Sequence, residues 1–343
     1  MARGTAVIST DYYIHKDQEL ANTGRDQKMR NNYTLENFKR ALRNPRLFVR
    51  EARRLLSLPI HVLYGAYFDY THRDGVQVMQ EDWDNLIILD ACRHDYFKDT
   101  NYMGGNLDKK ISKGRKSWEF MQKNFAGRRF HDTVYVTANP FVTRLDDNTF
   151  YSVDSLNEYW DEDIGTILPE NVTSAAIEAN RRYPHKRLII HFMQPHRPYL
   201  GETAEQLRER IDLVGYRNEG EGLQIWGAAK QGDVSVSEVR RAYTDSLNIV
   251  LSEVDRLLSE ISGKSVITAD HGEMLGEKIL PFTSRVWGHS EGFSLPELRT
   301  VPYFTIEDGT RRDIKRDEPT SDDGLHEDIV TKRLDALGYK EET

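Results

Sequence analysis

The chain has 343 residues, of which 38% are hydrophobic, and a formal net charge of −8. This length and hydrophobic content are enough for one large domain with appendages. The modest negative charge argues against nucleic acid as the main partner, and no apolar run reaches the roughly 20 residues of a membrane-spanning helix. Cys92 is the only cysteine, so no internal disulfide can form. We therefore expect a cytoplasmic protein, or one bound at a membrane surface.

Residues 1–80 are expected to form a polar N-terminus followed by a basic, amphipathic helical extension. Apolar residues recur at helical spacing from Phe38 to Leu56, and Pro45 is expected to divide this stretch into two helices. The polar face of the stretch is rich in lysine and arginine. Such a stretch, residues 38–56, could lie against an anionic membrane, but we favour a surface helix packed on the main domain.

Residues 81–310 alternate between strand-like and helix-like patterns. The expected strands are 85–89, 133–137, 187–192, 265–269 and 302–306, and the expected helices are 117–124, 171–182 and 235–261. This alternation predicts an α/β domain with a mostly parallel central sheet flanked by helices. Residues 311–343 are predicted to be a charged linker, flexible over its first part, followed by a C-terminal helix from about residue 325 to 337.

Asp270 and His271 follow a β-branched run and precede Gly272 and Glu273. A strand that ends there would place a carboxylate and an imidazole at the carboxyl edge of the sheet, where open α/β sheets bind ligands. These ligand types suit a divalent cation, although the same pair also occurs in exposed turns. Asp90 ends the first apolar strand in the same way, where it could bind a metal or cap a helix.

Two further loops carry histidines. His196 lies between two prolines, which fix the direction of its loop, and the adjacent Arg197 could bind an anion or form a surface salt bridge. His191, inside the preceding strand, is more typical of a core histidine. His289 follows the Asp270-His271 pair, and we expect it to point into the same cleft.

In this order, these stretches resemble the landmarks of the sulfatase-like branch of the alkaline phosphatase superfamily. Residues 266–277 resemble its signature, 85–93 its first strand and metal-binding aspartate, and 191–196 its histidine loop. Residues 287–289 and 298–302 resemble its next landmarks. The resemblance covers about residues 82–306 and implies an alkaline phosphatase-like fold.

The resemblance also implies a hydrolase or transferase that acts on sulfate or phosphate esters and binds one or two divalent cations. Zinc, manganese, calcium and magnesium are not distinguished. By matching position, the metal ligands would be Asp90, Asp270 and His271. His196 and His289 would contact the anionic oxygens of the substrate, the leaving group or a second metal. Gln194 stands near a position where related enzymes carry an aspartate, which favours a single metal.

The nucleophile is expected between Asp90 and the strand at Thr133, at a helix N-terminus where backbone N–H groups favour an anion. Ser117 is the preferred nucleophile and a further metal ligand, and Ser112 is its rival. Lys113 and Arg115 could hold the sulfate or phosphate group, or belong to an ordinary solvated loop. The chain lacks the Cys-x-Pro-x-Arg sequence of formylglycine sulfatases, which favours phosphate, whereas the resemblance to the sulfatase-like branch favours sulfate.

The predicted function is therefore metal-dependent hydrolysis or transfer of a sulfate or phosphate ester through a metal-activated serine. The substrate would be a small-molecule, glycan or lipid-headgroup ester. The alternative is a noncatalytic protein that binds an anionic glycan or lipid headgroup in a surface-polymer pathway. The position of Ser117 relative to the metal ligands separates the two hypotheses.

Overall fold

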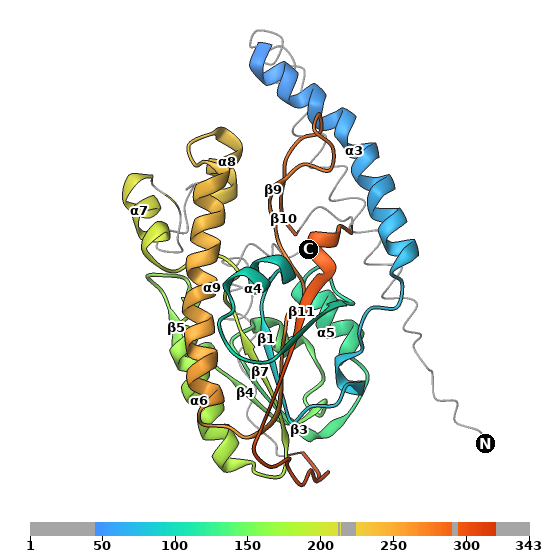
Figure 1. The fold of residues 1–343 in the computed structure, drawn as a ribbon, viewed down its shortest axis with the longest axis vertical. Helices are drawn as coiled ribbons and strands as arrows, with labels where there is room; N and C mark the ends of the chain where they lie inside the picture. Colours follow the sequence, from blue (N-terminus) through green and yellow to red (C-terminus); the bar gives the residue numbers. More distant parts are fainter. Residues whose placement is uncertain (1–44, 212, 214–223, 290–293, 320–343) are drawn as a thin grey trace, which may run out of the picture.

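The fold is built on one central sheet, seen in a computed structural model that describes residues 45–211, 213, 224–289 and 294–319 (Figure 1). Its seven strands have the order β2-β11-β8-β1-β7-β3-β4. They are β1 (Asn85–Leu89), β2 (Asn106–Ile111), β3 (Phe130–Thr137), β4 (Phe150–Ser155), β7 (Arg187–Phe192), β8 (Gly263–Thr268) and β11 (Thr300–Asp308). Only β11 runs antiparallel to its neighbours. The predicted mostly parallel α/β sheet is confirmed.

The central strand β1 is buried at every position because both faces of the sheet are covered. On one face Ile87 and Leu89 join a core with α6 (Pro169–Arg182) and α9 (Val236–Leu258), while α4 (His94–Thr100) packs nearby. On the other face Leu86 and Ile88 pack with α5 (Ser117–Asn124). Figure 1 shows α6 and α9 together along one side of the sheet.

Smaller elements surround this core. Helices α7 (Glu202–Arg210) and α8 (Ile225–Gln231) pack on α9, and α10 (Pro296–Arg299) leads into β11. Two-stranded sheets join β5 (Trp160–Asp161) to β6 (Thr166–Ile167), and β9 (Met274–Glu277) to β10 (Val286–Gly288). Short 3-10 turns are η1 (Val78–Gln80), η2 (Pro140–Arg144) and η3 (Asn157–Tyr159).

The basic extension contains one helix, α3 (Pro45–Thr71), which begins at Pro45 and continues well beyond the predicted end at residue 56. The part predicted before Pro45 lies outside the described residues. Ser57, His61 and Phe68 are buried against the rest of the protein, whereas Leu56 and Leu63 are exposed. The helix thus packs on the main domain through a face that mixes polar and apolar side chains. No helix in the described ranges is long and apolar enough to span a membrane.

The described beginning of the charged C-terminal segment is bound to the main domain. Arg311 forms ion pairs with Asp82 and Asp84, and Lys186 Nζ lies 2.6 Å from a carboxylate oxygen of Asp317. These contacts disagree with the prediction of a flexible connection over this stretch. The predicted helix at residues 325–337 lies outside the described residues.

Candidate metal centre

Adjacent parallel strands bring polar side chains from distant parts of the sequence to one edge of the sheet. In the order β8-β1-β7-β3, the strands all end at the same edge. Asp90 directly follows β1, Asp270 follows β8, His191 lies near the end of β7, and Asn139 follows β3. This is the edge at which α/β sheets bind ligands, because the strand ends leave a crevice between the connecting loops.

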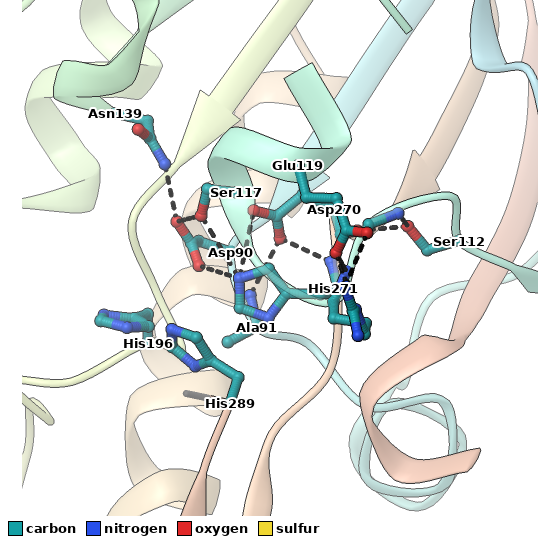
Figure 2. A network of polar contacts seen from close by, with 12 residues as sticks. Asp90, Ala91, Ser112, Ser117, Glu119, Asn139, His196, Asp270, His271 and His289 are labelled. Atoms are coloured by element: carbon teal, nitrogen blue, oxygen red, sulfur yellow. Dashed lines mark hydrogen bonds and ion pairs between the residues drawn. The ribbon is translucent and has the colours of Figure 1, made fainter. Parts of the chain in front are cut away.

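Ser117 lies among the predicted metal ligands, at the first residue of α5 (Figure 2). Its Oγ donates a hydrogen bond to Asp90 Oδ2 at 3.1 Å and lies 3.3 Å from His271 Nε2. The same Asp90 oxygen accepts a hydrogen bond of 2.9 Å from Asn139 Nδ2. His271 Nε2 is 3.5 Å from Asp90 Oδ1 and 3.5 Å from Asp270 Oδ2. The structure therefore brings Asp90, Ser117, Asp270 and His271 together.

The backbone fixes the ring of His271 in the orientation that a metal ligand needs. His271 Nδ1 lies 2.8 Å from the Gly272 carbonyl oxygen, which can only accept, so we assign the ring proton to Nδ1. Nε2 is then left with a lone pair facing Asp90, Asp270 and Ser117. A backbone carbonyl often plays this part behind metal-binding histidines.

Several buried atoms of this group lack a hydrogen-bond partner among the described residues: Asp90 Oδ1, Asp270 Oδ2 and His191 Nε2. The potential ligand atoms of Asp90, His191 and Asp270 all lie within 4.8 Å of one another. Unpaired polar atoms are rare in protein interiors because they lose their hydration without compensation. A divalent cation would satisfy all three, so the residues present fit such an ion.

The protonation equilibria of the group favour the same conclusion. Burial, followed by the nearby charge of Asp270, raises the pKa of Asp90 well above its usual value. Burial lowers the pKa of His191 to about 4 and also lowers the pKa of His271. The imidazoles are therefore neutral at physiological pH, which is the form that binds metals. A cation would supply the positive charge that these buried carboxylates lack.

A second group of potential ligands lies beside the first: His196, Glu273 and His289, whose ligand atoms are also within 4.8 Å of one another. His289 Nδ1 is 3.1 Å from Glu273 Oε1, and the rings of His289 and His271 are 4.4 Å apart. Burial raises the pKa of Glu273 to about 8 and lowers that of His289 to about 3. His196 Nδ1 lies 2.6 Å from the Arg197 carbonyl oxygen, which directs Nε2 away from that backbone.

Sequence reasoning missed His191 and Glu273 as members of these groups. His191 had been interpreted as a core histidine, and it is fully buried, but its Nε2 faces Asp270 at 3.9 Å. Glu273 stood in the central motif without an assigned role. Its place directly after Gly272, within the motif, was the one feature of the sequence that could have indicated a role. The contact with His289 depends on the turn that leads into β9, which the sequence does not predict.

Arg197 and Gln194 occupy different surroundings in the histidine loop. Arg197 is buried, and its guanidinium lies 4.4 Å from the centre of the Trp226 ring. Burial lowers the pKa of both His196 and His289, and the positive charge of Arg197 adds to this effect. Gln194 Nε2 donates to the Ile167 carbonyl oxygen at 3.1 Å. The amide of Gln194 thus supports β6, and a second cation would have to use His196, Glu273 and His289.

The loop before Ser117 contacts the Asp270 loop on one side and lines a separate cavity on the other. Ser112 Oγ donates to the backbone carbonyl of Asp270 and accepts a hydrogen bond of 3.1 Å from the Gly114 N–H. Ser112 therefore supports the Asp270 loop. Lys113 and Arg115 line a separate cavity of about 610 Å³ between α3 and α5. Arg115 pairs there with Glu119, at 3.0 Å.

The turn after β1 holds Asp90 in place at some conformational cost. Ala91 has a φ of 59°, a left-handed conformation that costs a residue with a side chain about 1–2 kcal/mol. Its N–H donates to Asp270 Oδ1 at 3.1 Å, and the Tyr243 hydroxyl donates to its carbonyl oxygen at 2.8 Å. The strained turn is thus directly connected to the second carboxylate of the centre.

No family model matches the chain, and neither does any curated protein. Among solved structures, it is similar to the C-terminal periplasmic domain of EptC from Escherichia coli in complex with Zn. The identity is 14%, the TM-score is 0.45, and the match covers 65% of this chain and 72% of that one. A 2-O glycosaminoglycan sulfatase has 11% identity and a TM-score of 0.39, with 74% and 70% covered. An alkaline phosphatase superfamily protein from Vibrio parahaemolyticus has 12% identity and a TM-score of 0.35, with 76% and 67% covered. Likenesses this distant transfer no residue role and no activity.

The predicted cytoplasmic location is wrong: the EptC structures to which the chain is similar, from Escherichia coli and Campylobacter jejuni, are periplasmic domains. The prediction rested on the single cysteine. Cys92 is buried, and burial raises the pKa of its thiol, so it has neither a partner cysteine nor the reactivity of an exposed thiolate. Such a residue is compatible with an oxidising compartment as much as with a reducing one.

The strands thus bring the residues of the landmark motifs to one edge of a mostly parallel sheet, as expected from the resemblance of those motifs to the sulfatase-like branch of the alkaline phosphatase superfamily.

Proposed function

We propose that the protein hydrolyses or transfers a sulfate or phosphate ester, with Ser117 as the nucleophile and a divalent cation bound beside it. One observation carries this proposal. Ser117 Oγ, at the N-terminus of α5, lies 3.1 Å from Asp90 Oδ2 and 3.3 Å from His271 Nε2. A serine placed for a merely structural helix cap would have no reason to face two buried metal-ligand types.

Asp90, Asp270 and His271 would hold the cation, with Ser117 Oγ as a further ligand and His191 within reach. When bound, the cation would lower the pKa of the serine hydroxyl and offset negative charge in the transition state. The unpaired atoms of Asp90, Asp270 and His191 support this ligand set. The identity of the cation is left to experiment, since both oxygen and nitrogen ligands are present.

The protein groups can carry the reaction through two displacement steps. The Ser117 hydroxyl passes its proton toward Asp90 Oδ2, its hydrogen-bond acceptor, as Oγ bonds to the phosphorus or sulfur. The bond to the departing ester oxygen breaks on the opposite side. Water or an acceptor hydroxyl then attacks the seryl ester, and its own proton passes through solvent to the departed ester oxygen. The bond from Ser117 Oγ to the phosphorus or sulfur breaks, and Asp90 returns the proton to Ser117. Backbone N–H groups in the first turn of α5 favour the anionic group throughout.

His196, Arg197 and His289 would act on the other side of the reacting group. The ring centres of His196 and His289 are 5.2 Å apart. The ring of His289 also contacts that of His271, a member of the first group, with ring centres 4.4 Å apart. His196 and His289 would steady the leaving oxygen or the non-bridging oxygens, with Arg197 adding positive charge. Together with Glu273, the same histidines form the candidate second cation site, so one or two ions are compatible with the proposal.

A three-substrate assay tests the function and separates sulfate from phosphate chemistry. The full chain, stripped by a chelator, receives zinc, manganese, magnesium or calcium with an aryl sulfate, a phosphate monoester or a phosphodiester. We expect metal-dependent turnover of at least one substrate and a loss of about a thousandfold or more in Ser117→Ala. Ser252→Ala, on the exposed side of α9, is the matched control and should match the wild type.

The noncatalytic alternative makes the opposite prediction in this assay. A protein that only binds an anionic headgroup would show no metal-dependent turnover of any of the three esters, in wild type or variants. Turnover that survives unchanged in Ser117→Ala would keep the activity but exclude this serine as the nucleophile.

A further inference from the structure

The side of α3 that faces away from the protein is apolar along most of the helix. Large hydrophobic side chains are exposed on this outer face: Val49, Leu55, Leu56, Val62, Leu63, Tyr67 and Tyr70. Leu56, Leu63, Tyr67 and Tyr70 are between 67% and 74% exposed. At about 100° of rotation per residue, Leu63 and Tyr70 lie roughly opposite the buried Ser57, His61 and Phe68. Leu56 and Tyr67 lie on the flank beside them. The outer face therefore has the composition expected of a buried surface.

A contiguous apolar surface of this extent is unfavourable in water and marks a place of contact. From Leu55 to Tyr70 the face runs for roughly 22 Å along the helix, at 1.5 Å per residue. Tyrosines cluster toward its C-terminal end, where each ring offers an apolar body and a polar hydroxyl. This pattern suits the boundary between an apolar phase and water.

A cationic cavity adjoins the outer face and shares residues with it. The cavity between α3 and α5, about 610 Å³ in volume, is lined by Ala66, Asp69, Tyr70, Arg73, Lys113, Arg115, Glu119, Lys123, Ser294 and Arg299. Its lining includes five cationic and two anionic side chains, a net charge of +3. Tyr70 belongs to both surfaces, and the Arg73 guanidinium lies 4.8 Å from its ring centre. The cavity could thus receive an anion held at the level of the apolar face.

We propose that the outer face of α3 docks on an anionic lipid bilayer, with its apolar side chains at the acyl boundary and a lipid phosphate in the adjoining cavity. A bilayer supplies the two chemistries that the surface combines, an apolar layer and a sheet of negative charge. Packing two copies through this face would instead bring two cationic cavities toward each other, and like charges oppose such contact.

Helix α3 is connected to the candidate metal centre through a short series of hydrogen bonds and ion pairs. Asp69 pairs with Arg299 at 2.8 Å, and Arg299 Nε donates to the Ser112 carbonyl oxygen at 2.8 Å. Ser112 Oγ in turn donates to the backbone of Asp270. In a second contact, the Ser284 N–H, in the loop between β9 and β10, donates a hydrogen bond to the Ser57 hydroxyl of α3 at 2.8 Å. Docking through α3 would therefore hold the centre at a fixed height above the lipid surface.

Vesicle flotation of the full chain tests the docking surface independently of catalysis. Phosphatidylcholine vesicles with about 30% phosphatidylglycerol are compared with phosphatidylcholine alone. We expect the wild type to float with the anionic vesicles, and a double variant, Leu56→Glu with Leu63→Glu, to lose about tenfold or more of this binding. Arg73→Glu should lose binding severalfold on anionic vesicles, and added salt should weaken the wild type. Tyr102→Glu, at a residue that is 60% exposed elsewhere on the protein, is the control.

Because the substituted side chains are exposed, the variants should keep the unfolding midpoint of the wild type and its turnover of a water-soluble ester. The proposal is overturned if the wild type does not float with anionic vesicles. It is also overturned if the double variant floats equally well, or if it changes only the oligomeric state seen by light scattering. Failure of the ester assay would leave this test unaffected, since flotation requires no catalysis.

Discussion

At the residue scale, Gly272 shows why the central motif needs its glycine. A Cβ placed on Gly272 would lie 2.0 Å from the backbone oxygen of Glu297, and the Gly272 N–H donates to the Leu298 carbonyl at 2.8 Å. The loop after β8 therefore packs directly against the backbone before β11. This contact holds Asp270 and His271 at the sheet edge.

Gly272→Ala should destabilise the fold strongly, because backbone cannot move aside as a flexible side chain can. We expect a loss on the order of 3 kcal/mol or more in the free energy of unfolding, measured by urea denaturation. Gly104→Ala is the matched control, because nothing lies within 4 Å of a Cβ at that position. Equal stability of the two variants would contradict the close approach.

The orientation of His271 yields a second prediction at this scale. With Nδ1 held by the Gly272 carbonyl, only Nε2 is available to a cation. His271→Gln, which can place a weaker neutral ligand in that region, should weaken metal affinity about tenfold to a hundredfold, measured by competition with a chelating dye. A variant with unchanged affinity would show that His271 is not a ligand.

The residues predicted from the sequence and those missed differ in one physical respect. Asp90, Asp270 and His271 directly end or follow apolar strands, so local pattern and sheet geometry together locate them. Glu273 and His191 acquire their roles through partners 16 or more positions away, as in the contact of Glu273 with His289. Such tertiary contacts have no local signature in a single sequence.

At the element scale, the buried strands were predictable and the edge strands were not. β1 and β7 each contain a continuous apolar run, and their predicted bounds agree with the structure. β2 and β4 mix polar and apolar residues because each lies at an edge of the sheet, where β2 has no fully buried residue and β4 has only two, so their sequences resemble loops. β11 was predicted as a strand, but its antiparallel direction depends on the path of the chain around the sheet.

Helix α5 should lose stability in acid through Glu119. Its carboxylate pairs with Arg115 and Lys123, whose hydrogen bonds and charges outweigh burial and lower the pKa to about 2 from 4.5. A lowered folded-state pKa gives stability that is complete above about pH 4.5 and is lost as the pH falls toward 2. The difference between wild type and Glu119→Gln should therefore shrink from on the order of 2 kcal/mol at pH 6 to near zero at pH 2.

Urea denaturation at a series of pH values measures this difference. The exposed Glu178 provides a control, since Glu178→Gln should follow the wild type across the range. If the free energy of unfolding of Glu119→Gln stays parallel to that of the wild type between pH 6 and pH 2, the Glu119 carboxylate does not contribute to the loss of stability in acid.

At the scale of the whole molecule, the candidate centre joins parts of the chain that are distant in sequence. Asp90 and Asp270 come from neighbouring strands, Ser117 from α5, and His289 from the loop after β10. A cation bound there would stabilise only the folded state, because the unfolded chain does not hold these groups together. The centre should thus affect folding as well as chemistry.

Chelation should therefore lower the thermal unfolding midpoint of the wild type by several degrees, and adding the metal back should restore it. Calorimetry with and without chelator measures the shift. Asp90→Asn, whose shape is conserved but whose charge is lost, should unfold at the same temperature under both conditions. A midpoint of the wild type that does not respond to chelation would argue against a resident cation.

The most direct test of the central claim is the metal content of the purified full chain, measured by mass spectrometry together with turnover, for the wild type and Asp270→Ala. We expect at least one divalent ion per wild-type chain, and the loss of both this ion and the activity in the variant. An Asp270→Ala protein that keeps its full metal content and full turnover would contradict the central claim.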